Sequence, residues 1–131
     1  MNQDTTTRTG TVLVIDDEQA VTGVIKAILT KEGYQVHIAN NGQSGVRLAA
    51  DVKPDLIILD ITMPDLDGYT TAELIKNTPG LANTPIIYLT GRTADEDGGR
   101  AFASGGASFV RKPFTGKQLS DLVKLAMQSI S

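Results

Sequence analysis

The sequence has no cysteine and no tryptophan among its 131 residues, and aromatic residues make up only 5% of it. The absence of cysteine excludes disulfide bonds, thiolate metal sites and thiol catalysis, and it fits a reducing compartment. No apolar run approaches the roughly 18 residues of a membrane span, and the polar first ten residues lack the apolar segment of a signal peptide. These absences predict a cytoplasmic protein with no membrane contact.

The remaining composition is that of an ordinary globular domain. Hydrophobic residues make up 40% of the chain and charged residues 21%, a balance typical of folded domains. A net charge of −3 with a pI of ≈ 5.0 argues against a nucleic-acid-binding surface. The length predicts one domain. We place it at residues 11–131, after a disordered, threonine-rich tail over residues 1–10.

Five short apolar runs predict buried β-strands, and a helical pattern follows each of them. The weakest helix is expected at about Ala94–Ser104, because Gly98 and Gly99 lie inside it; we expect it to be short or mobile. The predicted strands are Thr11–Ile15, Gln35–Ala39, Asp55–Leu59, Pro85–Leu89 and Ala107–Val110. A βα unit repeated five times implies a parallel sheet with right-handed crossovers, in an α/β fold.

The second run differs from the others because it alternates polar and apolar residues. Val36 and Ile38 alternate with Gln35 and His37, which suits an edge strand with one face toward water. The pattern is consistent with a doubly wound sheet of strand order 2-1-3-4-5. His37, the only histidine, is then an edge-strand residue and not a phosphoryl relay.

Charged or hydroxyl side chains follow four of the five runs directly. Asp16 and Asp17 follow the first run, Asp60 the third, Thr90 the fourth, and Lys112 comes two residues after the fifth. Parallel strands all end at the same edge of a sheet, so these side chains should converge there. That edge is where open α/β sheets bind ligands.

Crowded carboxylates oppose one another's ionisation, and a hard divalent cation resolves the conflict. Mg²⁺ prefers oxygen ligands and takes one or two carboxylates directly while keeping several waters. An aspartate can also act as a nucleophile and form an acyl phosphate. A lysine and a hydroxyl beside it can then neutralise the phosphoryl oxygens.

In this order and spacing the motifs resemble those of response-regulator receiver domains of two-component signalling, the CheY-like family with a flavodoxin-like fold. The resemblance covers about Thr11–Ile130 and rests on Asp16-Asp17, Asp60, Met63-Pro64-Asp65-Leu66-Asp67-Gly68, Thr90 and Lys112-Pro113-Phe114.

The resemblance implies a role for each matched residue. Asp60 is the phosphoacceptor. Asp16 or Asp17, with Asp60 and the backbone carbonyl of Thr62, holds Mg²⁺, directly or through water. Lys112 and Thr90 bind the phosphoryl group, and Phe109 is an aromatic switch that moves with Thr90.

The implied function is a bacterial phosphorylation switch and not a turnover enzyme. A sensor histidine kinase or a histidine phosphotransfer protein supplies the phosphoryl group. A downstream protein binds the face formed by the fourth helix, fifth strand and fifth helix. We expect a monomer or a weak dimer. Asp65 and Asp67 are expected to serve a turn and a helix cap, not a metal.

Three other interpretations stay open at this point. A haloacid-dehalogenase-like phosphatase or phosphotransferase also uses an aspartate after a strand, but Thr62 stands where that class has a second acid. A degenerate receiver would bind a partner without phosphorylation, against which the intact acidic set argues. A flavodoxin-like nucleotide binder would need a glycine-rich phosphate loop after the first strand, and none is present.

Overall fold

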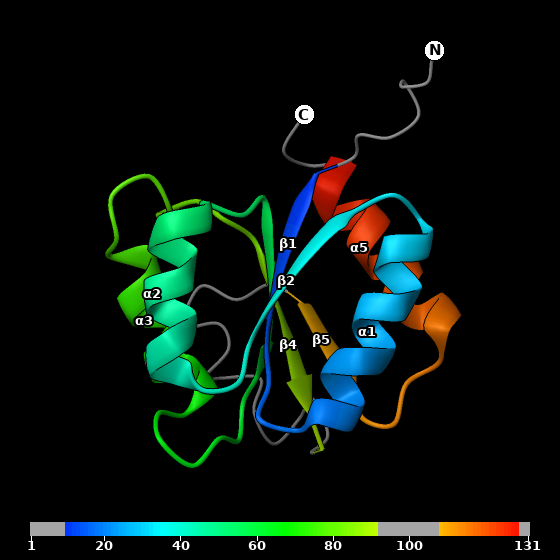
Figure 1. The fold of residues 1–131 in the computed structure, drawn as a ribbon, viewed down its shortest axis with the longest axis horizontal. Helices are drawn as coiled ribbons and strands as arrows, with labels where there is room; N and C mark the ends of the chain where they lie inside the picture. The colour runs from blue at the N-terminus through cyan, green and yellow to red at the C-terminus, as the bar shows by residue number, and fades with distance from the viewer. Residues whose placement is uncertain (1–9, 92–107, 129–131) are drawn as a thin grey trace.

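The strands and helices of the chain alternate, as the apolar runs predict. In a computed structural model, residues 10–91 and 108–128 are described (Figure 1). The strands are β1 (Thr11–Ile15), β2 (Gln35–Ala39), β3 (Leu56–Asp60), β4 (Ile86–Thr90) and β5 (Ser108–Arg111). The helices are α1 (Gln19–Lys31), α2 (Gly42–Val52), α3 (Gly68–Lys76) and α5 (Gly116–Gln128). The predicted helix at about Ala94–Ser104 lies outside the described residues, as does the predicted tail except for Gly10.

The five strands form one parallel sheet in the order β2-β1-β3-β4-β5, which confirms the predicted topology. β1 and β2 have the predicted bounds, β3 and β4 each begin and end one residue later than predicted, and β5 ends one residue later. All five residues of β3 and of β4 are buried, while β2 is mostly half-exposed. This difference confirms β2 as an edge strand and places the site-bearing strands at the centre.

Two hydrophobic cores lie on opposite faces of the sheet, because side chains alternate between faces along each strand. Leu13 and Ile57 point to the face covered by α2 and α3. Val12 and Ile58 point to the face covered by α1 and α5. Figure 1 shows the two helix pairs on either side of the sheet. With both faces covered, only the sheet's ends are open to ligands.

Side chains that accept hydrogen bonds from backbone N–H groups start two of the helices. The Asp67 carboxylate accepts a bond from the Thr70 N–H and caps α3, as predicted. Asn41 caps α2 through the Ser44 N–H. Asp65 adds a second clamp there, because its two carboxylate oxygens accept bonds from the Gly42 and Gln43 N–H groups. Asp67 therefore has its predicted cap role, whereas Asp65 joins its loop to the start of α2 through contacts that are distant in the sequence.

None of the helices in residues 10–91 and 108–128 has the length and apolar composition needed to span a membrane.

Candidate functional site

The chemistry-bearing side chains sit at the carboxyl edge of the sheet, at or just past the ends of its central strands. Asp16 follows β1, whereas Asp60 and Thr90 are the last residues of β3 and β4. The Lys112 N–H donates to the Thr90 carbonyl at 2.7 Å, which ties the end of β5 to the end of β4. Parallel pairing thus assembles residues that are up to 96 positions apart in the chain (112 − 16).

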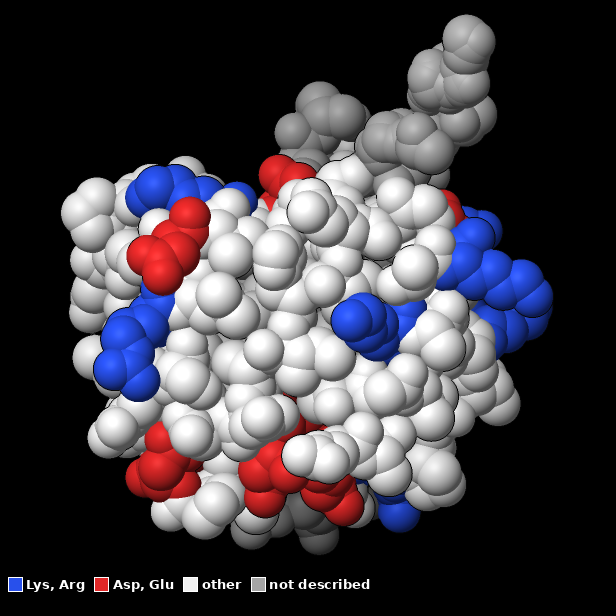
Figure 2. All heavy atoms as spheres, viewed as in Figure 1, with Lys and Arg blue, Asp and Glu red and all other residues white. Residues whose placement is uncertain are grey.

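Asp16, Asp17 and Asp60 form a compact carboxylate cluster. One oxygen from each lies within 4.8 Å of the others. Asp16 is fully buried and Asp60 nearly so, whereas Asp17 is exposed. Figure 2 shows acidic side chains gathered at the lower end of the molecule, where the strands end in Figure 1. The predicted convergence of these three residues is therefore observed.

Lys112 supplies the positive charge of the cluster. Its Nζ lies 3.0 Å from Asp16 Oδ2 and 3.6 Å from Asp60 Oδ1. Burial works to lower the pKa of Lys112, but the contacts with Glu18, Asp16 and Asp60 outweigh it and raise that pKa. Lys112 is therefore a permanent ammonium ion at the centre of the acidic group.

Asp60 is the carboxylate whose protonation responds most to this environment. Burial, followed by the charge of Asp16, raises the pKa of Asp60 to about 7. Lys112 and a bond at 3.2 Å from the Thr62 N–H to Asp60 Oδ1 oppose that rise. The negative charge on Asp60 is thus poorly compensated, and an added cation would stabilise it.

Glu18 belongs to the same cluster, although our sequence reasoning did not include it. Its Oε1 accepts a hydrogen bond from Lys112 Nζ at 2.9 Å, and its backbone N–H donates to Asp16 Oδ1 at 2.9 Å. The hydrogen bond and charge of Lys112 hold the pKa of Glu18 below its usual range. Its position directly after Asp16-Asp17 was the available signal, but the spacing reads equally well as a helix start.

Phe109, the predicted switch residue, lies in a row of aromatic rings. The sequence reasoning did not identify this row. Phe109 pairs with Tyr88 in the β4–β5 register, and their ring centroids are 5.7 Å apart. Tyr88 in turn packs on Tyr69 of α3 at 5.1 Å. Tyr88 is fully buried and Phe109 half-buried. Tyr88 lies two residues before Thr90 on the same strand, so β4 connects this aromatic row to the site.

The peptide bond between Lys112 and Pro113 is cis.

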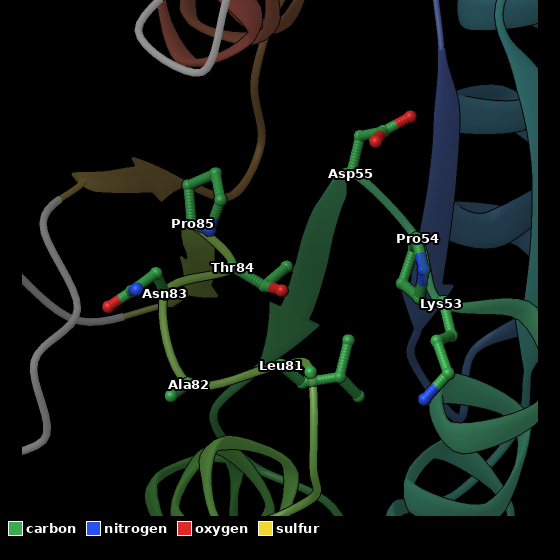
Figure 3. A pocket seen from close by; sticks show the side chains of 9 residues that line it. Lys53, Pro54, Asp55, Leu81, Ala82, Asn83, Thr84 and Pro85 are labelled. Carbon is green, nitrogen blue, oxygen red and sulfur yellow. The ribbon is translucent and has the colours of Figure 1, made fainter.

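A separate hollow of about 430 Å³ lies at the opposite, amino edge of the sheet (Figure 3). Lys53, Asp55 and Leu81 are among its lining residues. The Lys53 ammonium donates to the Pro79 carbonyl at 3.1 Å, and Asp55 accepts a bond from the Thr11 N–H at 2.9 Å. Figure 3 shows the Asp55 carboxylate pointing away from Lys53. In the described ranges, no cluster of three carboxylates like that of Asp16, Asp17 and Asp60 lies at this edge.

A family comparison agrees with the fold. Residues 12–124 match the response regulator receiver domain, and the chain belongs to this family. It is 33% identical to the protein PilG of Pseudomonas aeruginosa over 120 residues, which cover 92% of this chain and 89% of PilG. Among solved structures it resembles chemotaxis protein CheY4 of Vibrio cholerae, with a TM-score of 0.87, 26% identity and coverage of 91% and 99% of the two chains.

Several relatives are longer than this chain. The Escherichia coli regulatory protein AtoC is 32% identical over 89% of this chain, but the match covers only 25% of AtoC. The match to the transcriptional regulatory protein AfsQ1 of Streptomyces coelicolor covers 51% of that protein. The shared part is therefore the receiver domain, which serves two-component signalling in bacterial response regulators.

Proposed function

We propose that this chain is the phosphoacceptor of a two-component phosphorelay and that Asp60 receives the phosphoryl group. The observation that carries this proposal is the placement of Asp60. It is nearly buried at the carboxyl edge, 3.6 Å from the Lys112 ammonium and within 4.8 Å of two other carboxylates. A carboxylate that only stabilised a loop would not need both crowding and an adjacent, partly buried ammonium.

In the proposed reaction, an Asp60 carboxylate oxygen attacks the phosphorus of a phosphohistidine on a sensor kinase or phosphotransfer protein. The new P–O bond forms as the P–N bond breaks, and the imidazole nitrogen keeps the electron pair of the broken bond. Lys112 lies close enough to neutralise a phosphoryl oxygen on Asp60. The Thr62 N–H, already directed at Asp60 Oδ1, helps to orient the carboxylate.

The donor set around Asp60 fits Mg²⁺. Three carboxylates offer oxygens within 4.8 Å of one another, and oxygen is the ligand that this hard cation prefers. Asp16, Asp17 and Asp60, with the Thr62 backbone carbonyl, would hold the ion. When bound, Mg²⁺ would neutralise the crowded carboxylates and the phosphoryl oxygens. The raised pKa of Asp60 is consistent with a site that needs an added positive charge.

Phosphorylation of Asp60 would be transmitted through Thr90 and Phe109. A phosphoryl group adds charge and strong acceptor oxygens, and the Thr90 hydroxyl, at the end of the neighbouring strand, would donate to one of them. Movement of Thr90 along β4 would be felt by Tyr88, on which Phe109 packs. The surface next to β5 and α5 would then bind a downstream protein, because even a small difference in contact energy shifts a two-state population.

The test is phosphorylation by acetyl phosphate, a small-molecule phosphodonor, in the presence of Mg²⁺. We expect one hydroxylamine-labile phosphate per chain, which does not form when Mg²⁺ is chelated beforehand and is absent in Asp60→Asn. Asp55→Asn, which changes an aspartate at the opposite edge, is the matched control and should be labelled like the wild type. Labelling that persists in Asp60→Asn would remove Asp60 from this role.

A further inference from the structure

Lys112 contacts three carboxylates, and the distances are unequal. Its Nζ lies 2.9 Å from Glu18 Oε1, 3.0 Å from Asp16 Oδ2 and 3.6 Å from Asp60 Oδ1. An ammonium has three N–H donors, and the usual upper limit for such a bond is about 3.2 Å. The two short contacts therefore hold the ammonium ion away from Asp60, the residue on which the proposed phosphoryl group forms.

The three partners also differ in how easily each can release Lys112. The Asp16 side chain is fully buried and that of Asp60 is 6% exposed, whereas the Glu18 side chain is 59% exposed. A buried carboxylate that loses its ammonium partner has no water to replace it. Water can hydrate the exposed Glu18 carboxylate when it releases Lys112. The Glu18 contact therefore breaks at the lowest cost in free energy.

The geometry points to Glu18 as a positioning residue that retains Lys112 in the unphosphorylated site and must release it when Asp60 is phosphorylated. This inference rests on the proposed function. Asp16 Oδ1 accepts the Glu18 N–H, so one buried aspartate anchors both the backbone of Glu18 and the ammonium that Glu18 binds. Glu18 thereby destabilises the form in which Asp60 is phosphorylated and favours loss of the phosphoryl group.

The first measurement is the NMR signal of the Lys112 side-chain ammonium in the protein without any phosphoryl group. Glu18→Gln should shift that signal, because the ammonium ion loses its shortest charged contact. Glu73→Gln removes one exposed carboxylate from α3 instead and should leave the signal unchanged. An unshifted Lys112 signal in Glu18→Gln would overturn the inference, whether or not the protein accepts phosphate.

The second measurement is binding of beryllofluoride, a phosphoryl mimic, at saturating Mg²⁺. We expect Glu18→Gln to bind it about two- to fivefold more tightly, the range that one exposed ion pair provides. Glu18→Asp keeps the charge but is one methylene shorter, so it should resemble Glu18→Gln and not the wild type. If Glu18→Asp resembles the wild type while Glu18→Gln does not, the charge acts through space and the proposed retention is wrong.

A double substitution separates the contact from other effects. In a Lys112→Gln background, Glu18→Gln should leave beryllofluoride affinity unchanged, because the ammonium that Glu18 holds is gone. A gain that persists there would also refute the inference. Failure of the wild type to bind beryllofluoride with Mg²⁺ would instead count against the proposed function of Asp60, and the Lys112 NMR signal would still test Glu18 by itself.

Discussion

The two edges of the sheet place ionisable side chains in opposite circumstances. At the amino edge, Asp55 and Lys53 each pair with a backbone group, the Thr11 N–H and the Pro79 carbonyl. At the carboxyl edge, Asp16, Asp17 and Asp60 crowd one another around a single lysine. The first arrangement stabilises the folded chain at each residue. The second buries Asp60 among like charges, and burial, followed by the charge of Asp16, raises the pKa of Asp60 to about 7.

The difference indicates which edge is built for chemistry. Polar groups that already form hydrogen bonds with the backbone gain little from binding a ligand. A buried carboxylate whose charge is poorly compensated gains from a cation or from reaction with an electrophile. The crowded like charges at the carboxyl edge reduce the stability of the folded protein, and reactive sites in proteins commonly have such a cost.

The largest expected effect comes from filling the space behind Asp60. A Cβ added at Gly68 would lie 2.6 Å from the Asp60 carbonyl oxygen and 2.7 Å from the Ile61 Cα, so backbone would have to move. We expect Gly68→Ala to lower the free energy of unfolding by about 3 kcal/mol in urea denaturation. Gly23→Ala, at an open position in α1, is the control and should raise it by about 0.5–1 kcal/mol. Equal effects would show that Gly68 is not confined.

The second prediction tests the crowding of carboxylates around Asp60 in protein without bound metal. The pKa of Asp60 is about 7 in the folded state against 3.8 as its ordinary value. The native state therefore binds this proton more tightly than the unfolded chain, so this stabilising contribution is lost as pH rises from about 4 through 7. Asp60→Asn removes the ionisation, and we expect it to stabilise the metal-free protein at pH 8 by about 2 kcal/mol.

Thermal unfolding of both proteins across pH 4–8 with a chelator measures this effect. The gain from Asp60→Asn should shrink toward zero near pH 4, where Asp60 is protonated in the folded state and partly protonated in the unfolded chain. Added Mg²⁺ should narrow the difference at pH 8 by stabilising the wild type alone. A pH-independent gain would show that ionisation of Asp60 is not its cause.

A smaller effect is expected at the amino edge. Asp55→Ala removes the acceptor of the Thr11 N–H, and we expect a loss of about 1 kcal/mol in the free energy of unfolding with unchanged labelling by acetyl phosphate. Asp55→Asn keeps a carbonyl acceptor and should recover most of the loss. A change in labelling would show that Asp55 affects the site at the carboxyl edge and that the two edges are not independent.

The smallest effect concerns Lys53, which caps α2 in the left-handed conformation with φ of 52°. Glycine adopts this conformation without strain, although Lys53→Gly also loses the bond to Pro79. We expect a net gain of about 0.5 kcal/mol in urea denaturation. Lys53→Ala keeps the strain and loses the bond, so it should be less stable than Lys53→Gly.

The sequence alone determined the fold and most members of the acidic edge, although not Glu18. Five apolar runs with helical patterns between them allow few arrangements other than a parallel sheet. Residues that directly follow such runs must meet at one edge, which is why Asp16, Asp60, Thr90 and Lys112 could be identified. Their roles as phosphoacceptor, metal ligand and phosphoryl-binding groups stay predictions that the experiments above test.

Only the tertiary structure decided how charge is shared at that edge. Glu18 joins Lys112 across 94 residues of sequence, and Asp65 clamps α2 from the β3–α3 loop. Neither contact has a periodicity or a short-range spacing in the sequence that would reveal it. Strand order is dictated by patterns of burial along the chain, but distances of 2.9 and 3.6 Å from one ammonium ion depend on how loops pack, and loop packing is a property of the whole fold.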